Sequence, residues 1–235
     1  MVLAGGPGTR LRPLTEEMPK SMISVKGKPF LQYQIELFKH SGIRDIVLCV
    51  GYLAEKIMEC FGDGGKFGVK IRYSVEGNRL LGTAGALKRS ESLLDDVFFI
   101  TYGDAYLMLD YANAMAYFKR FNKLGLMVVY KNFNRFDKSN VIVEDGYVKV
   151  YDKRRQTPDM VYIDYGVSVL RRESLALIPP DVVMDLQEFY RVLIEPGELL
   201  AYETYNRFYE IGSFRGLKEF RQLSSRGVLC HNVNL

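Results

Sequence analysis

Two kinds of hydrophobic pattern alternate along the first half of the chain. Continuous apolar runs at 45–50 and 97–101 are typical of parallel strands that are buried on both faces. Shorter apolar segments predict further strands over 1–4, 69–75 and 126–130. Apolar residues at helical spacing predict helices over 29–40, 54–61, 82–94 and 111–122. This alternation predicts an α/β fold with right-handed crossovers, namely a Rossmann-like, doubly wound, mostly parallel mixed sheet.

The second half of the chain has a different pattern. Alternating segments at 141–143 and 148–151 flank Asp145-Gly146, and this dipeptide between such segments is a strong hairpin signal. The remaining signals predict a strand over 162–170, a helix that starts at a capping box formed by Asp185 and Glu188, and a last helix from the N-cap Ser213 to Phe220. No repeat or linker divides the chain, so we expect a single domain over residues 1–235.

The composition excludes several classes of protein. With 48% hydrophobic and 26% charged residues the chain is typical of globular proteins, and its 14 Phe and 16 Tyr exclude a mainly disordered state. The net charge of +4 permits an anionic small molecule as substrate, but no block of Lys and Arg indicates nucleic acid. No apolar run approaches the roughly 20 residues that span a bilayer, and no secretory signal pattern opens the sequence. We therefore expect a cytoplasmic protein without a membrane partner.

Three cysteines and two histidines limit the available chemistry. Cys49, Cys60 and Cys230 lack the number and spacing of a disulfide framework, and with His40 and His231 they form neither a zinc motif nor a nucleophilic pair. Cys49 lies within an apolar run and is expected in the core. The chemistry must therefore come from other residues.

The most informative segment is glycine-rich and follows the first predicted strand. It reads Gly5-Gly6-Pro7-Gly8-Thr9-Arg10-Leu11-Arg12-Pro13-Leu14-Thr15 and is followed by Pro19-Lys20-Ser21-Met22. Glycines at this place let the backbone approach a ligand and turn its N–H groups towards an anion. Together with Arg10, Arg12 and Lys20 at the carboxyl edge of the sheet, they suit a polyphosphate. Neither a Walker loop nor Gly-x-Gly-x-x-Gly occurs; a plain turn with solvated basic residues is the alternative.

Acidic residues follow two of the predicted strands. Gly103-Asp104 comes after a buried strand, where a carboxylate is well placed to hold Mg²⁺ together with phosphate oxygens, although such an aspartate can also simply cap a turn. Glu76 precedes Leu81-Gly82-Thr83-Ala84-Gly85-Ala86, and the start of the helix in this segment offers backbone donors to a negative charge or a base edge.

These motifs, in this order, resemble those of the sugar-1-phosphate nucleotidyltransferases (NDP-sugar pyrophosphorylases) of the short, single-domain type. The resemblance extends over nearly the whole chain. It implies a nucleoside triphosphate and a sugar 1-phosphate as partners, Mg²⁺ as cofactor, a nucleotide-binding half over 1–131 and a sugar-phosphate-binding half over 132–235. The implied catalytic residues are Arg10 and Lys20, which would stabilise the transferring α-phosphate and the departing pyrophosphate. The implied nucleotide-binding residues are Leu3, Ala4, Gly5, Gly6, Gly8, Thr9, Arg10, Lys20, Glu76, Gly82, Thr83 and Gly103.

The later motifs depart from this family. The implied metal ligands are Asp104 and Glu210, but the family has aspartate at the second position, and Phe214 stands where proline is usual. The implied sugar-phosphate-binding residues are Gly85, Lys153, Asp164 and Gly166. Lys153 lies in Asp-Lys-Arg where the family has Glu-Lys-Pro, and Asp164 lies in Asp-Tyr-Gly in place of Asn-Ala-Gly. Asp164 can either bond sugar hydroxyls or simply finish a strand, and the changed motif favours a sugar other than glucose.

The choice of base depends on Glu76. The family often has glutamine there in uridylyl and thymidylyl enzymes, whereas a carboxylate can accept the N1–H and the amino group of guanine. This favours GTP with a manno-configured sugar such as heptose or mannose 1-phosphate, although a solvated loop glutamate is equally compatible. Uridylyl or thymidylyl transfer, a phosphocholine cytidylyltransferase-like activity and a non-catalytic NDP-sugar-binding role stay open. Homo-oligomerisation through aromatic residues such as Phe133 and Tyr205 also stays open.

Overall fold

The computed structural model describes residues 1–77 and 80–226, which form two compact units. Unit 1 comprises Met1–Leu80, Thr101–Asp110 and the described residues from Phe208 onwards, and unit 2 comprises Leu81–Ile100 and Tyr111–Arg207. Unit 2 is formed by two separate stretches of the chain. The predicted functional halves, in contrast, divide the chain at a single point, between residues 131 and 132. The units and the expected functional halves therefore do not coincide, and the halves stay a prediction.

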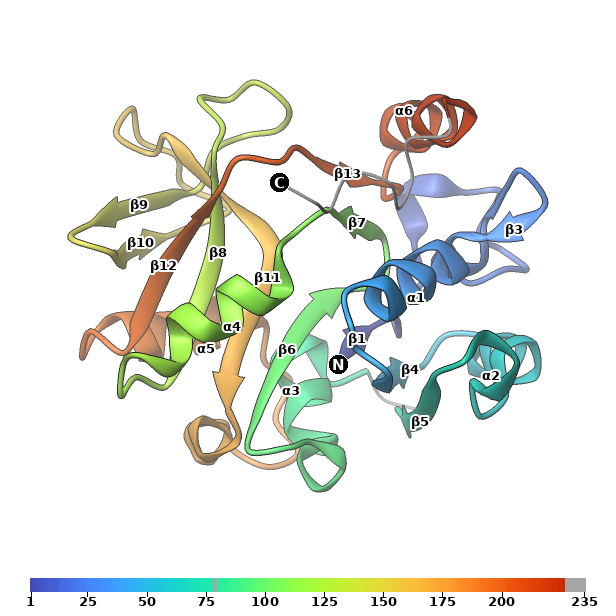
Figure 1. The fold of residues 1–235 in the computed structure, drawn as a ribbon, viewed down its shortest axis with the longest axis horizontal. Helices are drawn as coiled ribbons and strands as arrows, with labels where there is room; N and C mark the ends of the chain where they lie inside the picture. Colours follow the sequence, from blue (N-terminus) through green and yellow to red (C-terminus); the bar gives the residue numbers. More distant parts are fainter. Residues whose placement is uncertain (78–79, 227–235) are drawn as a thin grey trace. The chain divides into compact units, whose positions relative to one another are not determined.

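Unit 1 is built on a parallel sheet with the strand order β5-β4-β1-β6 (Figure 1). Its strands are β1 (Val2–Leu3), β4 (Asp45–Val50), β5 (Lys70–Val75) and the end of β6 (Val97–Tyr102). β1 has only two residues, but it is hydrogen-bonded to a strand on each side. Because these strands are parallel, the loops that follow β1 and β6 leave from the same edge, and the Gly103 amide donates to the Leu3 carbonyl at 2.8 Å.

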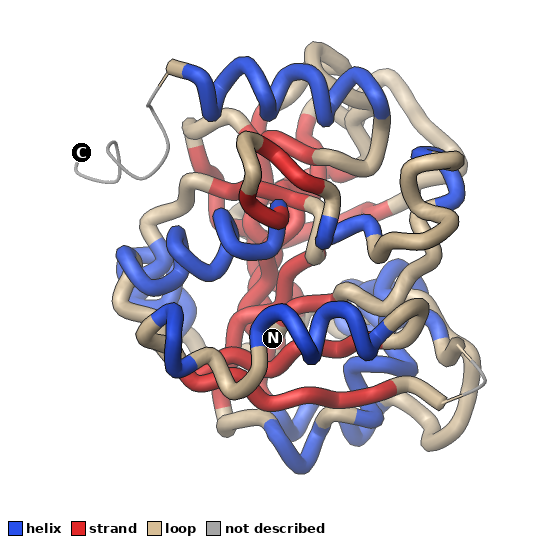
Figure 2. The backbone as a smooth tube through the Cα atoms, turned by 90° about the vertical axis from the view of Figure 1, so that its right-hand side faces the viewer, coloured by secondary structure: helices blue, strands red, loops and turns tan. Residues whose placement is uncertain are grey.

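The core of unit 1 gathers around Phe220 of α6 (Phe214–Ser225), the uppermost helix in Figure 2. The centroid of its ring lies 4.8 Å from that of Phe30, 5.5 Å from that of Tyr33 and 5.2 Å from that of Tyr106. Leu11, from the glycine-rich segment, is buried in the same cluster. The glycine-rich segment is thus anchored by an apolar residue in the core.

The other helices of unit 1 follow the hydrophobic pattern. α1 (Phe30–His40) and α2 (Ala54–Phe61) have almost the predicted bounds. Single turns of 3₁₀-helix lie in the loops, at Thr9–Leu11, Lys20–Met22 and Gly65–Phe67.

Two short ladders in unit 1 were not predicted. β2 (Ser24–Val25) pairs with β3 (Lys28–Pro29), and β7 (Ala105–Leu107) pairs with β13 (Phe208–Glu210), both antiparallel. The second ladder places Glu210 opposite Ala105, and the Ile211 amide donates to the Asp104 carbonyl at 2.8 Å. Segments of two or three residues have no pattern of their own, so these ladders could not be predicted. The family resemblance implied that residues 104 and 210 act together, and the fold shows which strands bring them side by side.

Unit 2 contains the other part of the sheet, in the order β6-β11-β8-β12-β10-β9. The antiparallel neighbours are β11 with β8, β12 with β10 and β10 with β9, and β9 also pairs antiparallel with the start of β11. β12 runs parallel to β8. In Figure 1, α4 crosses in front of β8, whose central residues are fully buried. The elements of this unit are β8 (Gly125–Lys131), β9 (Val141–Glu144), β10 (Tyr147–Tyr151), β11 (Tyr162–Arg171), β12 (Leu199–Thr204), α3 (Gly82–Arg89), α4 (Tyr111–Lys119), α5 (Leu186–Ile194) and 3₁₀ turns at Glu91–Leu93 and Arg172–Leu177.

Several predictions are confirmed in both units. The hairpin turns at Asp145-Gly146, between β9 and β10. The capping box at the start of α5 is formed by Asp185 and Glu188. In unit 1, Ser213 is the N-cap of α6, and Cys49 is buried.

Other helix ends were misplaced. The helix expected over 82–94 ends at Arg89, because the buried Ser90 hydroxyl bonds the Ala86 and Leu87 carbonyls, each at 2.9 Å. The helix expected over 111–122 ends at Lys119, and α6 continues beyond Phe220 to Ser225. β12 was not predicted. Cys230 and His231 lie outside the described residues.

The surface gives two further findings. None of the helices within residues 1–77 and 80–226 has the length and apolar character needed to cross a membrane. Phe133 and Tyr205 are strongly exposed, at 62% and 85% of their surface, so they do not belong to the core.

Candidate functional site

The glycine-rich segment closes into a tight loop around Gly8. Gly8 has a φ of +60°, and a β-carbon there would lie 3.0 Å from the Lys20 β-carbon and 3.1 Å from a Thr15 methyl carbon. Its carbonyl accepts from the Leu11 amide at 3.0 Å and from the Thr15 hydroxyl at 2.9 Å. A side chain at this position would be strained and crowded. The glycine therefore permits the approach of Lys20 to the loop.

The residues directly after β1 lie along the backbone of β4. The Ala4 amide donates to the Cys49 carbonyl at 2.8 Å, and the Gly5 carbonyl accepts from the Tyr52 amide at 3.0 Å. A β-carbon on Gly5 would overlap the carboxylate of Glu76, which is buried. The fold thus places Glu76 directly against the glycine-rich segment. Gly6 and Thr9 are both exposed in this loop.

Three charged side chains converge beside Gly212. A β-carbon on this glycine would lie 2.9 Å from Asp104 Oδ2, 2.9 Å from Glu210 Oε2 and 3.1 Å from Arg10 Nη2. These residues come from three separate stretches of the chain. Lys20 Nζ in turn forms an ion pair with Asp104 Oδ2. Two acids and two cations therefore form one cluster in unit 1.

The composition of this cluster fits a divalent cation. Mg²⁺ prefers one or two carboxylates and completes its coordination with water and phosphate oxygens. Asp104 Oδ2 and Glu210 Oε2 are two such carboxylate oxygens, and each lies 2.9 Å from the place of a Gly212 β-carbon. Residues 1–77 and 80–226 contain no group of three or more His, Cys, Asp or Glu side chains that could form a closed metal cage. The site therefore suits a metal that is shared with an anionic ligand.

One supporting residue escaped the sequence analysis. Gln34 is 1% exposed on α1, and its Nε2 donates to the carbonyls of Tyr102 (2.9 Å) and Ala105 (2.5 Å), which flank Gly103 and Asp104. It holds the turn that carries Asp104. An amide on the apolar face of an amphipathic helix is the signal that could have found it, because such a group must find partners inside the protein.

The expected nucleotide loop of unit 2 is tied to a neighbouring segment. The Met184 carbonyl accepts from the amides of Ala84 (2.9 Å) and Gly85 (3.3 Å), and the Thr83 hydroxyl accepts from the Leu186 amide (2.7 Å). The amides of Ala84 and Gly85 therefore already have a partner. A role of Gly82, Thr83 and Gly85 in binding a ligand stays a prediction.

Asp164 lies in an irregular stretch of β11. Its Oδ2 accepts from the Tyr151 hydroxyl at 2.8 Å and its Oδ1 from the Gly166 amide at 2.9 Å. Gly166 has a φ of +97°, and the pairing with β8 shifts register between Asp164 and Ser168. Asp164 thus does more than finish a strand, because it stabilises the bulge that contains Gly166. Burial raises the pKa of the neighbouring Tyr190, and the charge of Asp164 raises it further.

Lys153 follows β10 on an exposed loop. Its amide donates to Gln187 Oε1 at 2.9 Å. The preceding residue, Asp152, accepts from the amides of Arg154 (2.7 Å) and Arg155 (3.0 Å), and Arg191 Nη2 lies 2.7 Å from its second oxygen. The hydrogen bonds donated by the backbone amides of Arg155 and Arg154 are the main cause of the lowered pKa of Asp152. The charge of Arg191 lowers this pKa further. The fold therefore fixes the backbone on both sides of Lys153.

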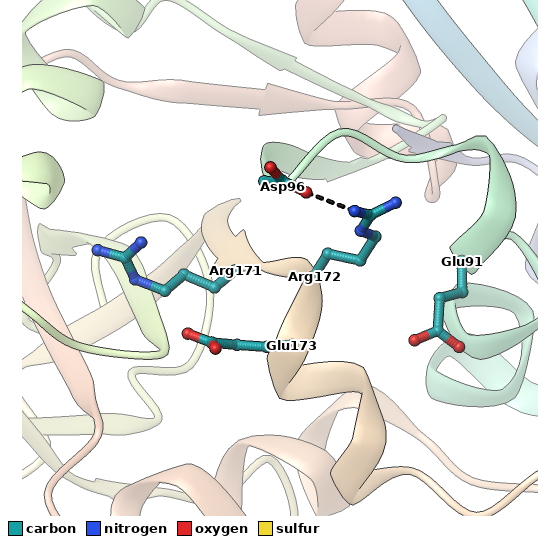
Figure 3. Close-up of a pocket in the computed structure, with 5 residues that line it drawn as sticks. All are labelled: Glu91, Asp96, Arg171, Arg172 and Glu173. Atoms are coloured by element: carbon teal, nitrogen blue, oxygen red, sulfur yellow. Dashed lines mark hydrogen bonds and ion pairs between the residues drawn. The ribbon is translucent and has the colours of Figure 1, made fainter.

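A charged hollow of about 320 Å³ lies elsewhere in unit 2 (Figure 3). It is lined by Glu91, Asp96, Arg171, Arg172 and Glu173. Arg172 forms an ion pair with Asp96, Arg171 Nε donates to the Lys123 carbonyl, and Glu91 pairs with Lys88. None of these five lining residues is a predicted site residue. Asp96 precedes β6, whereas Gly103 and Asp104 follow that strand.

Comparison with known proteins now adds to this geometry. A family model described as "Nucleotidyl transferase" matches residues 1–150, which is more than half of the chain. The chain belongs to this nucleotidyl transferase family. The match includes the glycine-rich segment, Lys20, Glu76 and Asp104, and the family resemblance noted in the sequence is thereby confirmed.

Relatives of this chain carry different specificities in their names. A UTP–glucose-1-phosphate uridylyltransferase from Synechocystis is 30% identical over 99% of this chain and 64% of its own length. A mannose-1-phosphate guanyltransferase from Saccharomyces cerevisiae is 30% identical over 90% of this chain and 60% of its own. A D-glycero-alpha-D-manno-heptose 1-phosphate guanylyltransferase from Campylobacter jejuni is 32% identical over 62% of both chains. The chain thus spans 60–64% of the length of these relatives.

Solved structures share the fold of this chain. A putative glucose-1-phosphate thymidylyltransferase from Bacillus anthracis, crystallised with sucrose, superposes with a TM-score of 0.84. The superposition covers 95% of this chain and 93% of that one, at 19% sequence identity. The predicted α/β fold with a mostly parallel sheet is therefore confirmed.

Proposed function

We propose that this chain transfers a nucleotidyl group from a nucleoside triphosphate to a sugar 1-phosphate and releases pyrophosphate. One observation carries the proposal. Asp104, Glu210 and Arg10 converge beside Gly212, where Lys20 is paired with Asp104, and the loop around Gly8 leads into this cluster. Such a cluster has both the acids that hold a divalent cation and the cations that hold phosphate oxygens.

The proposed reaction is an in-line displacement. An oxygen of the sugar phosphate attacks the α-phosphorus of the triphosphate, the bond from that phosphorus to the bridging oxygen breaks, and pyrophosphate leaves with the electron pair. Arg10 and Lys20 bind oxygens of the transferring and leaving phosphates and stabilise the negative charge that builds up there. Asp104 and Glu210 hold the metal, proposed to be Mg²⁺, which neutralises further phosphate charge when it is bound. No side chain needs to form a covalent bond.

In the same proposal, unit 2 supplies the sugar-phosphate residues. Lys153 is exposed and offers a point charge to the phosphate of the incoming sugar. Asp164 accepts one hydrogen bond at each oxygen and retains lone pairs for sugar hydroxyls. Gly166, with a φ of +97°, presents no side chain to a ring next to the backbone. The space beside Gly85 is filled by Leu81 and Val182, so Gly85 contributes to this proposal only through the packing of α3.

GTP and a manno-configured sugar 1-phosphate are the proposed substrates. Two things support this choice: the carboxylate of Glu76, which can accept from two donors of guanine, and the similarity to guanylyltransferases of mannose and heptose phosphates. UTP with glucose 1-phosphate is the rival pair, because a uridylyltransferase is similar over 99% of the chain.

A pyrophosphate-release assay tests the proposal. GTP, UTP, dTTP, CTP and ATP are each combined with mannose, heptose and glucose 1-phosphate in the presence of Mg²⁺. We expect release with GTP and a manno-configured substrate, its loss in Asp104→Asn, and no effect of Asp45→Asn, a surface control in the same unit. Faster release with UTP and glucose 1-phosphate would favour the rival. No release from any combination would refute nucleotidyl transfer.

A further inference from the structure

The acidic residue at the end of β13, four positions before α6, has a longer side chain than its family counterpart, and α6 makes room for it. Glu210 stands where the resembled family has aspartate, so its carboxylate is one methylene further from the backbone. Its two oxygens have different surroundings. Oε2 points to the position shared with Asp104 and Arg10, whereas Oε1 accepts from the Ser213 hydroxyl at 2.5 Å.

The direction of the hydrogen bonds at Ser213 follows from the donor count. The Gly216 amide donates to Ser213 Oγ at 2.9 Å, which makes Ser213 the N-cap of α6. A hydroxyl has a single proton, and here that proton is free for the carboxylate of Glu210. The chain of bonds therefore runs from the Gly216 amide through the Ser213 hydroxyl to Glu210 Oε1.

Gly216 makes room for the longer side chain. A β-carbon at this position would overlap Glu210 Oε1 and would also meet the Glu210 backbone carbonyl. The carboxylate consequently lies against the first turn of α6, where the positive end of the helix dipole favours negative charge. α6 itself is held in the core by Leu217 and Phe220, both buried, so the serine is attached to a rigid element.

We propose that Ser213 is a positioning residue for the metal: it anchors one oxygen of Glu210 so that the other stays directed at the point shared with Asp104. The inference rests on the proposed function, since it takes Asp104 and Glu210 as the metal ligands. It also explains how a glutamate can serve where the family has the shorter acid. The extra methylene is accommodated by turning the carboxylate back towards α6.

Variants at Ser213 separate this role from helix capping. Ser213→Gly removes the hydroxyl, but glycine is an acceptable N-cap, so the helix keeps most of its stability. Ser213→Thr keeps the hydroxyl. Ser225→Gly is the matched control, because it makes the same substitution at the far end of the same helix.

The test is a titration of the full chain with Mn²⁺ alone, followed by the electron paramagnetic resonance signal of free Mn²⁺. Loss of a residue that orients a metal ligand typically weakens metal binding ten- to hundredfold. We expect Ser213→Gly to raise the Mn²⁺ dissociation constant about tenfold with a nearly unchanged melting temperature. Ser213→Thr and Ser225→Gly should stay within about twofold of the unsubstituted chain.

Two ligand variants separate this inference from the proposed function. If Asp104→Asn and Glu210→Gln weaken Mn²⁺ binding but Ser213→Gly does not, or if Ser213→Thr is as weak as Ser213→Gly, the role of Ser213 is refuted and the metal site stands. If the chain binds no Mn²⁺, or binds it equally well without Asp104 and Glu210, the metal assignment fails and the inference fails with it.

Discussion

The charged cluster of unit 1 and the polar network around Asp164 in unit 2 are assembled in different ways. Arg10 and Lys20, Asp104, and Glu210 come from three distant stretches and meet in one cluster beside Gly212, where their charges balance one another. Asp164 instead forms hydrogen bonds with residues that are close in sequence. Gly166 lies on the same strand, and Tyr151 lies on β10, 13 residues earlier. A balanced cluster loses its function when one charge is removed, whereas a locally bonded network can shift and keep part of it. Changes in unit 1 should therefore mainly affect the rate, and changes in unit 2 the affinity for the sugar phosphate.

The largest effect is expected at Lys20. Lys20→Met leaves Asp104 without its ion-pair partner and, in the proposed mechanism, removes a cation that binds the phosphates. We expect kcat to fall by about 10³-fold, the size of loss seen when one group that stabilises a charged transition state is removed. Pyrophosphate release measures it, with Lys66→Met as a control at an exposed lysine of the same unit. A loss below tenfold would contradict a direct role for Lys20.

A smaller and different effect is expected at Lys153. Lys153→Met should raise the KM for the sugar 1-phosphate by roughly 10- to 100-fold, the value of one hydrogen bond to a charged group, with kcat changed less than about threefold. Lys149→Met, on β10 four residues earlier, is the matched control and should behave as the unsubstituted chain. An equal fall in kcat and kcat/KM would erase the contrast between the two units.

Tyr151 tests the network itself. Tyr151→Phe removes the donor to Asp164 Oδ2 and leaves this oxygen with one partner fewer next to a buried ring. The free energy of unfolding should fall by about 1–2 kcal/mol, measured with urea, and the KM for the sugar phosphate should rise a few-fold. Tyr147→Phe on the same strand serves as the control. Unchanged stability and KM would show that the bond does not hold Asp164.

The smallest effect concerns pH. The pKa of Asp152 is lowered in the folded protein, so its charge stabilises the fold at a pH above its ordinary pKa, and this stabilisation is lost as the pH falls through the lowered value. Asp152→Asn keeps an acceptor for the loop amides but loses the pair with Arg191. Its melting temperature should be about 2 °C lower at neutral pH and equal to that of the unsubstituted chain in strong acid. If the difference in melting temperature between Asp152→Asn and the unsubstituted chain grows towards acid pH, the stabilising role of the Asp152 charge is contradicted.

The two regions also differ in what could be read from the sequence. Long amphipathic or wholly apolar segments such as α1 and β4 were predicted almost to the residue, because their side-chain period directly reflects burial. The glycine-rich segment was recognisable because it needs particular backbone conformations and charges in a fixed order. The residues that bring the cluster together were not predictable. β7 and β13 are three residues long, and Gln34 acts through carbonyls that no sequence pattern shows.

Ser213 illustrates the same limit. Its role as an N-cap was predicted from its place before an amphipathic segment, but its bond to Glu210 depends on where the end of β13 lies relative to α6. In unit 2, Asp164 was left undecided between a sugar contact and a strand end. Its bonds to Tyr151 and Gly166 show a third role, the support of a bulge.

A crystal structure with GTP and Mn²⁺ tests the central claim most directly, because anomalous scattering locates the metal independently of the rest of the density. The account predicts one strong Mn²⁺ peak bound by Asp104 and Glu210, with triphosphate oxygens completing its coordination and with Arg10 and Lys20 on the phosphates. A Mn²⁺ peak away from both carboxylates, or a triphosphate that contacts neither Arg10 nor Lys20, would contradict it.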